Sequence, residues 1–155
     1  MVSKEYIITG AMLILVTYTL GLSLVSQAFP AGQTTRTLSS TGAIQIQATS
    51  GIGVYSDDQG TTPLTSVPWG TLQPGGSQNL ICYIKNEGSS ATTLSLETSN
   101  WNPASAANYL TLSWNYNGQP IDANAVVQIT LTLSVDSGIE GITSFGFDIT
   151  IVGSS

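Results

Sequence analysis

The residues best suited to hold a metal ion are two adjacent aspartates, Asp57 and Asp58, in a segment that ends at Gly60. Calcium accepts carboxylate oxygens arranged in a flexible loop. Aspartate is also common in turns because its side chain hydrogen-bonds to nearby backbone. No D-x-D-x-D-G series is present. The pair is therefore interpreted as a turn, with a weak calcium site as the alternative.

Catalytic chemistry has few candidate residues in this chain. Histidine is absent, which excludes Ser/His and Cys/His nucleophile pairs and zinc held by histidine. Paired carboxylates could still serve a glycosidase. However, the acidic residues fall mostly in expected turns or on outward strand positions, and no two share an apolar pocket by pattern. We expect no catalytic residues and no cofactor apart from possible calcium.

Aromatic residues stand beside amides in two expected loops. They are Trp101-Asn102-Pro103, with Tyr109 nearby in the sequence, and Tyr116-Asn117-Gly118. This arrangement is typical of a site where a sugar stacks on an aromatic ring. It is equally typical of aromatics that pack a loop, and Pro103 and Gly118 are turn residues. The packing role is the favoured interpretation.

Charge is scarce and mostly negative. Charged residues make up 8% of the chain, against about 25% in an ordinary soluble domain, and the net charge is −6. Beyond the N-terminal region only Arg36 and Lys85 are basic. Binding to nucleic acid or to anionic lipid headgroups needs clustered basic residues, so neither is expected. Cys82 is the single cysteine, so the chain has no internal disulfide, and its place in an alternating strand predicts a small buried hydrophobe.

The N-terminal region carries a long uncharged stretch from Tyr6 to Thr35. Within it, Ile7–Val25 is close to the ~20 apolar residues that a helix needs to cross a bilayer. Ser26-Gln27-Ala28 then offers the small residues that signal peptidase accepts. Residues 1–28 are therefore either a signal peptide or a retained transmembrane helix. Both predict an exported domain, extracellular or at the cell surface, that remains attached to the membrane if the helix is not cleaved.

The segments that could position these residues are short, and apolar and polar residues alternate along them. The clearest alternation spans Val127–Val135 and Phe145–Ile151. Strict alternation indicates strands with one buried face, as in antiparallel sheets. About seven or eight such strands, separated by Gly, Pro and Asn turns, predict an immunoglobulin-like two-sheet antiparallel sandwich over residues 42–155, preceded by the hydrophobic helix. Residues 29–41 are interpreted as a polar spacer or a donor strand.

A series of short motifs resembles one group of secreted proteins. In chain order the motifs are Thr41-Gly42-Ala43-Ile44, Gly53-Val54-Tyr55-Ser56-Asp57, Trp69-Gly70-x-Leu72-x-Pro74-Gly75, Tyr83-Ile84-Lys85-Asn86-x-Gly88 and Thr98-Ser99-Asn100-Trp101. Together they resemble the β-sandwich proteins of microbial biofilm fibres, the TasA/camelysin-like matrix proteins and the archaeal bundling pilins.

The resemblance implies a structural protein that polymerises with itself by donor-strand exchange. The matching donor segment is Gly32 to Gln47, and the residues expected to carry assembly are Leu38, Ile44, Ile46 and Gln47. A metallopeptidase role, which is assigned to some camelysin-like proteins, does not carry over because histidine is absent.

A second hypothesis is a monomeric, membrane-anchored surface sandwich that binds components of the cell wall, the S-layer or the archaellum. The two hypotheses differ in one property. Strand donation requires the first strand to be missing from its own sheet, whereas a strand at Ile44 paired within its own chain favours the anchored domain.

Overall fold

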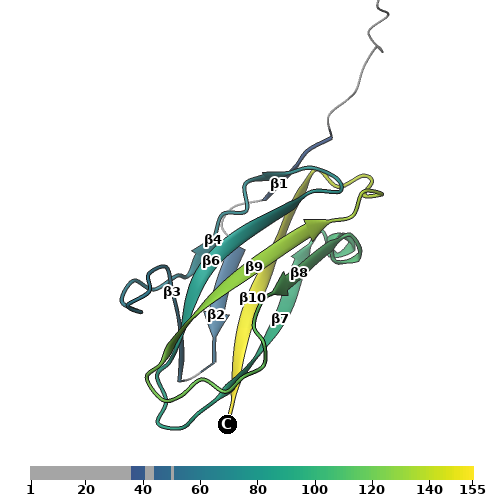
Figure 1. The fold of residues 1–155 in the computed structure, drawn as a ribbon. Helices are drawn as coiled ribbons and strands as arrows, with labels where there is room; N and C mark the ends of the chain where they lie inside the picture. The colour runs from purple at the N-terminus through teal and green to yellow at the C-terminus, as the bar shows by residue number, and fades with distance from the viewer. Residues whose placement is uncertain (1–35, 41–43, 50) are drawn as a thin grey trace, which may run out of the picture. The chain divides into compact units, whose positions relative to one another are not determined.

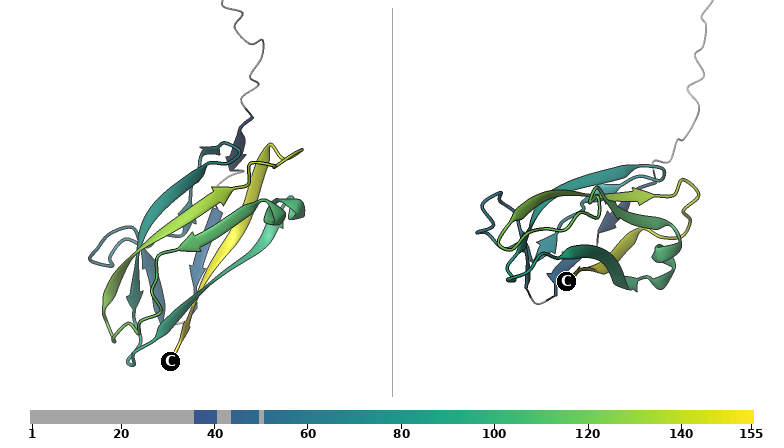
Figure 2. Two further views of the ribbon diagram at one scale, coloured as in Figure 1. Left: turned by 45° about the vertical axis from the view of Figure 1, so that its right-hand side comes forward. Right: turned by 60° about the horizontal axis from the view of Figure 1, so that its bottom comes forward.

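The structure is a computed structural model that describes residues 36–40, 44–49 and 51–155. The expected hydrophobic helix and residues 29–35 lie outside the described residues. In the part that is described, strands dominate. They form two sheets, here called sheet 1 and sheet 2, which lie in separate layers (Figures 1 and 2).

Sheet 1 is built around the C-terminal strand β10, which lies between β7 on one side and the N-terminal strands on the other (Figure 1). β1 and β2 pair with successive parts of β10. β5 then pairs with β1, and β4 pairs with β2. The strands of this sheet are β1 (Leu38–Ser40), β2 (Ile44–Ala48), β4 (Ser66–Val67), β5 (Thr71–Leu72), β7 (Thr93–Asn102) and β10 (Ser144–Ser154).

Sheet 2 has the strand order β3-β6-β9-β8, and all of its neighbouring strands are antiparallel. A 3-10 helix, η2 (Ala104–Asn108), connects β7 of sheet 1 to β8 of sheet 2. The strands are β3 (Ile52–Tyr55), β6 (Ser77–Asn86), β8 (Leu110–Trp114) and β9 (Val126–Val135).

Alternation along the strands sends every second side chain into a core shared by the two sheets. In β9, Ile129, Leu131 and Leu133 are buried, and in β10, Phe145 and Ile149 are buried. Burying each such side chain contributes roughly 1.5–3 kcal/mol. The expected all-β fold with two sheets is therefore confirmed, and both long alternating stretches form strands as predicted.

One part of the predicted architecture is wrong. The sandwich was expected to be antiparallel, but β1 and β2 both run parallel to β10, so sheet 1 is mixed. The physical reason is that successive side chains point to opposite faces of a strand whichever direction its neighbour runs, so alternation shows which face is buried and not the strand direction. The sandwich also begins before residue 42, because Leu38 of β1 already lies in the core.

Asn86, at the end of β6, is a buried polar residue whose hydrogen bonds are satisfied. Its side-chain amide donates to the carbonyls of Ser90 (2.7 Å) and Ile121 (2.9 Å), and its oxygen accepts from Gly88 N–H (2.9 Å). These bonds tie the turn after β6 to the segment before β9.

Candidate functional site

The segment predicted to carry assembly lies inside its own sheet. β2 pairs in parallel with β10, where Ile46 is opposite Ile149, and it pairs antiparallel with β4, where Ile44 is opposite Val67. β1 pairs in the same manner with β10 and β5, where Leu38 is opposite Leu72. The N-terminal strands therefore occupy an interior position of sheet 1.

The inward side chains of this segment are part of the core. Leu38, Ile44 and Ile46 are 1%, 1% and 3% exposed, whereas Gln47 is exposed on the outer face. The structure thus brings the three predicted apolar assembly residues together on one face and places Gln47 on the other. If β1 and β2 left the sheet, these three side chains and their partners on β10 would be exposed.

The connection from β2 to β3 is short and crosses from sheet 1 to sheet 2. Thr49 N–H donates to the carbonyl of Ile151 (3.0 Å), and Ile52 N–H donates to the carbonyl of Thr49 (3.1 Å). Gly51 has a φ of 85°, a conformation that glycine adopts at little cost. This connection is where the N-terminal strands would have to separate from the rest of the domain.

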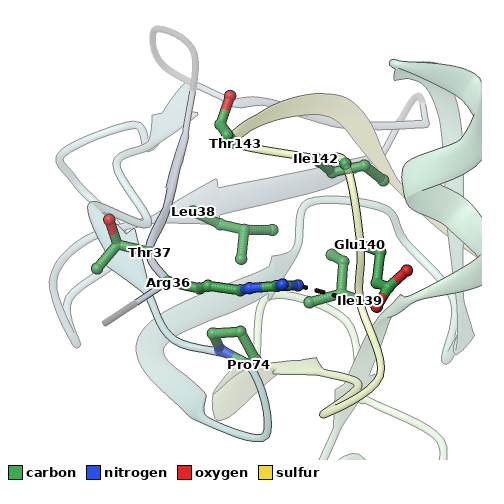
Figure 3. Close-up of a pocket in the computed structure, with 9 residues that line it drawn as sticks. Arg36, Thr37, Leu38, Pro74, Ile139, Glu140, Ile142 and Thr143 are labelled. Carbon is green, nitrogen blue, oxygen red and sulfur yellow. Dashed lines mark ion pairs between the residues drawn. The ribbon is translucent and has the colours of Figure 1, made fainter. Parts of the chain in front are cut away.

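A cavity of about 520 Å³ opens beside the start of β1 (Figure 3). It is bounded by Arg36, Leu38 and Pro74 and by the loop before β10, including Ile139 and Glu140. The guanidinium of Arg36 lies 4.0 Å from the carboxylate of Glu140, and both side chains are largely exposed. Such an exposed pair contributes only about 0–1 kcal/mol. The cavity combines these two charges with aliphatic side chains and with the side chains of Thr37 and Thr143.

Asp57 is engaged by donors in the turn after β3. Its carboxylate accepts from Thr62 N–H (2.5 Å), Thr61 N–H (3.1 Å), the Thr61 hydroxyl (3.0 Å) and Gln59 N–H (3.1 Å). Desolvation raises the pKa of Asp57, but the hydrogen bonds from Thr62 and Thr61 outweigh it and lower the pKa to about 2. A carboxylate surrounded by N–H groups has a structural role in the turn.

Asp58 has a different hydrogen-bond partner from Asp57. Its carboxylate accepts from the side-chain amide of Gln59 (3.2 Å). Within residues 36–40, 44–49 and 51–155, no three acidic, histidine or cysteine side chains gather as a metal site would need. The geometry of the two aspartates therefore supports the turn interpretation.

The aromatic residues named as a possible sugar-stacking site make contacts within the domain. Trp101 belongs to β7, not to a loop, and its ring stacks on Phe147 with centroids 4.1 Å apart. The Tyr116 ring lies tilted against Trp114, with centroids 5.3 Å apart, and its hydroxyl donates to the carbonyl of Gln119. Tyr109 is half-buried. These contacts describe side chains that pack the domain.

Cys82 is fully buried in the core. Burial raises the pKa of its thiol to about 11, so the thiolate form is scarce at neutral pH. Because the thiolate is the reactive form, this residue acts as a small apolar side chain.

No protein-family model matches the chain, and a search of curated proteins finds no match. Among the residues that the structure describes, no helix is long and apolar enough to cross a membrane. The apolar stretch Ile7–Val25 lies outside those residues.

Proposed function

We propose that the protein is a non-catalytic structural domain of the cell surface, complete within one chain and held at the envelope by its N-terminal apolar segment. The observation that supports it best is the position of β1 and β2 between β10 and the β4 and β5 strands of the same chain. The sheet of one copy has its first strand in place, so it needs no strand from a neighbour.

The chemistry of the described residues is consistent with a passive role. Asp57 is held by backbone donors, Cys82 is buried, and the aromatic rings pack against one another. The surface has few charged side chains and many Ser, Thr, Asn and Gln side chains, which suits contact with uncharged components of a cell wall or S-layer. These envelope components are the proposed partners.

A second candidate is the filament subunit, and a specific observation favours it. The chain passes from β2 to the rest of the domain through the short connection between Ala48 and Ile52, and short hinge connections promote exchange of a terminal element between copies. A neighbour's strand would make the same contacts that β1 and β2 make now, so exchange would lose no core packing.

Two cysteines placed across β2 and β10 distinguish these candidates. Gln47 and Thr150 are opposite each other in the parallel register, at a spacing that a disulfide can bridge. In the Gln47→Cys/Thr150→Cys variant of the full chain, oxidation should link the two strands within one molecule and leave a monomer band on a non-reducing gel. Strand exchange would instead give a ladder of linked subunits. Gln47→Cys alone is the control, because Cys82 is buried.

Localisation is tested on the native protein. Cell fractionation with N-terminal sequencing should find the domain outside the cytoplasmic membrane, and immunogold labelling of intact cells should mark the surface. Recovery of the protein from the cytoplasm would contradict the proposal. Filaments in negative stain, together with the ladder, would favour the second candidate.

A further inference from the structure

The edge strands of the two sheets differ in length and in cover. At one edge of sheet 1, β4 and β5 are two residues each and are separated by Pro68-Trp69-Gly70. β3, at one edge of sheet 2, is covered by the segment that follows it, because Leu64 N–H donates to the carbonyl of Val54 (2.8 Å). β8, at the other edge, is five residues long. These are the short or covered edges that folded proteins use to avoid unwanted pairing.

β7 is different from the other edge strands. It is ten residues long and, among the described residues, it pairs only with β10. It contains no proline or lysine and one charged residue, Glu97. A long strand without these protective features presents a row of backbone donors and acceptors that another strand can use.

Hydrogen bonds on the far side of β10 show which amides of β7 point outward. Gly153 N–H donates to the Thr49 hydroxyl (2.9 Å), and the Ile151 carbonyl accepts from Thr49 N–H (3.0 Å). Residues 151 and 153 therefore direct their backbone groups toward the β2 side, and by alternation residues 150 and 152 direct theirs toward β7.

The β7 residues opposite positions 150 and 152 are Glu97 and Ser95. Their backbone groups face β10, so those of Leu94, Leu96 and Thr98 face away from the sheet. The bond from Leu94 N–H to the Tyr116 hydroxyl (3.3 Å) confirms this direction independently.

The open part of the edge has definite ends. At its start, the Tyr116 hydroxyl accepts from Leu94 N–H. At its far end, Asn100 has a φ of 53°, and the pairing with β10 is irregular between Gly146 and Asp148. The amides of Leu96 and Thr98 lie between these ends. Among the described residues, neither amide donates a hydrogen bond to another segment as the Leu94 amide does.

Charge disfavours one register in which this edge could pair with a copy of itself. A twofold antiparallel pair centred on Glu97 would set the two carboxylates directly opposite each other, which is destabilising. Centring the pair on Leu96 sets Glu97 opposite the partner's Ser95 and Leu94 opposite the partner's Thr98. In that register the carboxylate meets a hydroxyl, and the half-buried Leu96 side chains meet each other on the inner face.

We propose that the outer edge of β7 pairs with the same edge of a second copy in an antiparallel register centred on Leu96. In this register Leu96 and Thr98 contribute their N–H groups, whereas Leu94 contributes only its carbonyl, because its N–H donates to the Tyr116 hydroxyl. Sheet 1 then continues across the twofold axis into the other molecule. The backbone groups on the outer edge of β7 take no part in the sheet when β1 and β2 pair within their own chain, nor when β1 and β2 exchange between copies. The pairing therefore goes beyond the proposed function and does not depend on it.

Amide hydrogen exchange of the full chain, followed residue by residue, tests the pairing directly. Above the dissociation constant of a dimer, a hundredfold rise in concentration lowers the unpaired fraction about tenfold by mass action. The Leu96 and Thr98 amides should therefore exchange about tenfold more slowly at the higher concentration. The Ser95 and Glu97 amides already bond to β10 and are the internal control, with the same rate at both concentrations. Equal rates for Leu96 and Thr98 at both concentrations would overturn the proposal.

A matched pair of variants gives a second, independent readout. Thr98→Pro removes the outward N–H, and Thr98→Ala removes the same side chain but keeps that N–H. Proline is tolerated in an edge strand where the N–H faces away from the sheet, and circular dichroism melts check that both variants fold. In analytical ultracentrifugation, Thr98→Ala should dimerise like the unmodified chain and Thr98→Pro should stay monomeric. Equal association of the two folded variants would refute the β7 edge as the interface.

Discussion

At the scale of single residues, Asp57 organises the turn after β3 through its charged carboxylate. Backbone N–H groups of Thr61 and Thr62 point at its carboxylate, and the Thr61 hydroxyl donates to the same group. The ionised form is the one these donors favour, which explains why the pKa lies below the ordinary aspartate value. The turn after β3, including the segment that covers the edge of β3, is organised around this carboxylate.

Replacing Asp57 should therefore change stability in a pH-dependent manner. A depressed folded-state pKa contributes stability above the ordinary aspartate pKa, and this contribution is lost as the pH falls through about 2. Asp57→Asn should lower the Tm at pH 7, and the difference from the unmodified chain should shrink between pH 4 and pH 2. Thermal melts across this range measure it.

Asp58→Asn is the control for this experiment, because Asp58 accepts only from its neighbour Gln59 among the bonds of this turn. Its Tm should follow that of the unmodified chain at every pH. A constant Tm difference for Asp57→Asn down to pH 2 would show that the carboxylate charge does not stabilise the turn.

At the scale of elements, the N-terminal strands carry core residues that a spacer would not. The sequence predicts either a polar spacer or a donor strand over residues 29–41, because Gln33–Thr41 is polar and shows no clear alternation. In the structure, Leu38 pairs opposite Leu72 and is buried. A strand of three residues is too short to produce a periodic signal, so only its partners reveal it.

A pair of substitutions on β2 measures how much this strand contributes. Ile46 is 3% exposed, so Ile46→Ala should lower the free energy of unfolding by about 2–5 kcal/mol through lost burial and a residual cavity. Gln47→Ala, on the exposed face of the same strand, should change it by less than about 0.5 kcal/mol. Urea unfolding provides both values. Similar values for the two variants would mean that β2 is not held in the sheet.

At the scale of the whole molecule, stability comes from burial and backbone pairing, with little from ion pairs. Among the described residues, the ion pair is Arg36–Glu140, at 4.0 Å and largely exposed. Lys85 is the other basic residue of this part, against eight acidic ones. Because the acidic residues are mostly unpaired, their mutual repulsion outweighs the ion-pair attraction.

Added salt should therefore stabilise the molecule slightly. Raising the salt concentration from 10 mM to 0.5 M screens the repulsion among the exposed carboxylates, so the Tm should rise modestly or stay level. Differential scanning calorimetry at neutral pH measures this change. A clear fall in Tm with sodium chloride would indicate that ion pairs stabilise the fold. That result would contradict the conclusion that ion pairs contribute little.

The sequence predicted the local features of this protein well. The absence of histidine limited the chemistry, and alternation along Val127–Val135 and Phe145–Ile151 identified two core strands and their buried faces. These features depend on residues one or two positions apart, so a sequence displays them directly. The short strands β4 and β5 are less visible in the sequence, because each has only two residues and Pro68-Trp69-Gly70 separates them.

Tertiary structure alone decided which strands are neighbours and in which direction they run. The parallel pairing of β1 and β2 with β10 joins residues about a hundred positions apart, and the open outer edge of β7 exists because no other described strand lies beside it. Alternation is a property of one strand, whereas pairing and edges are properties of distant segments brought together, and a local pattern does not encode them.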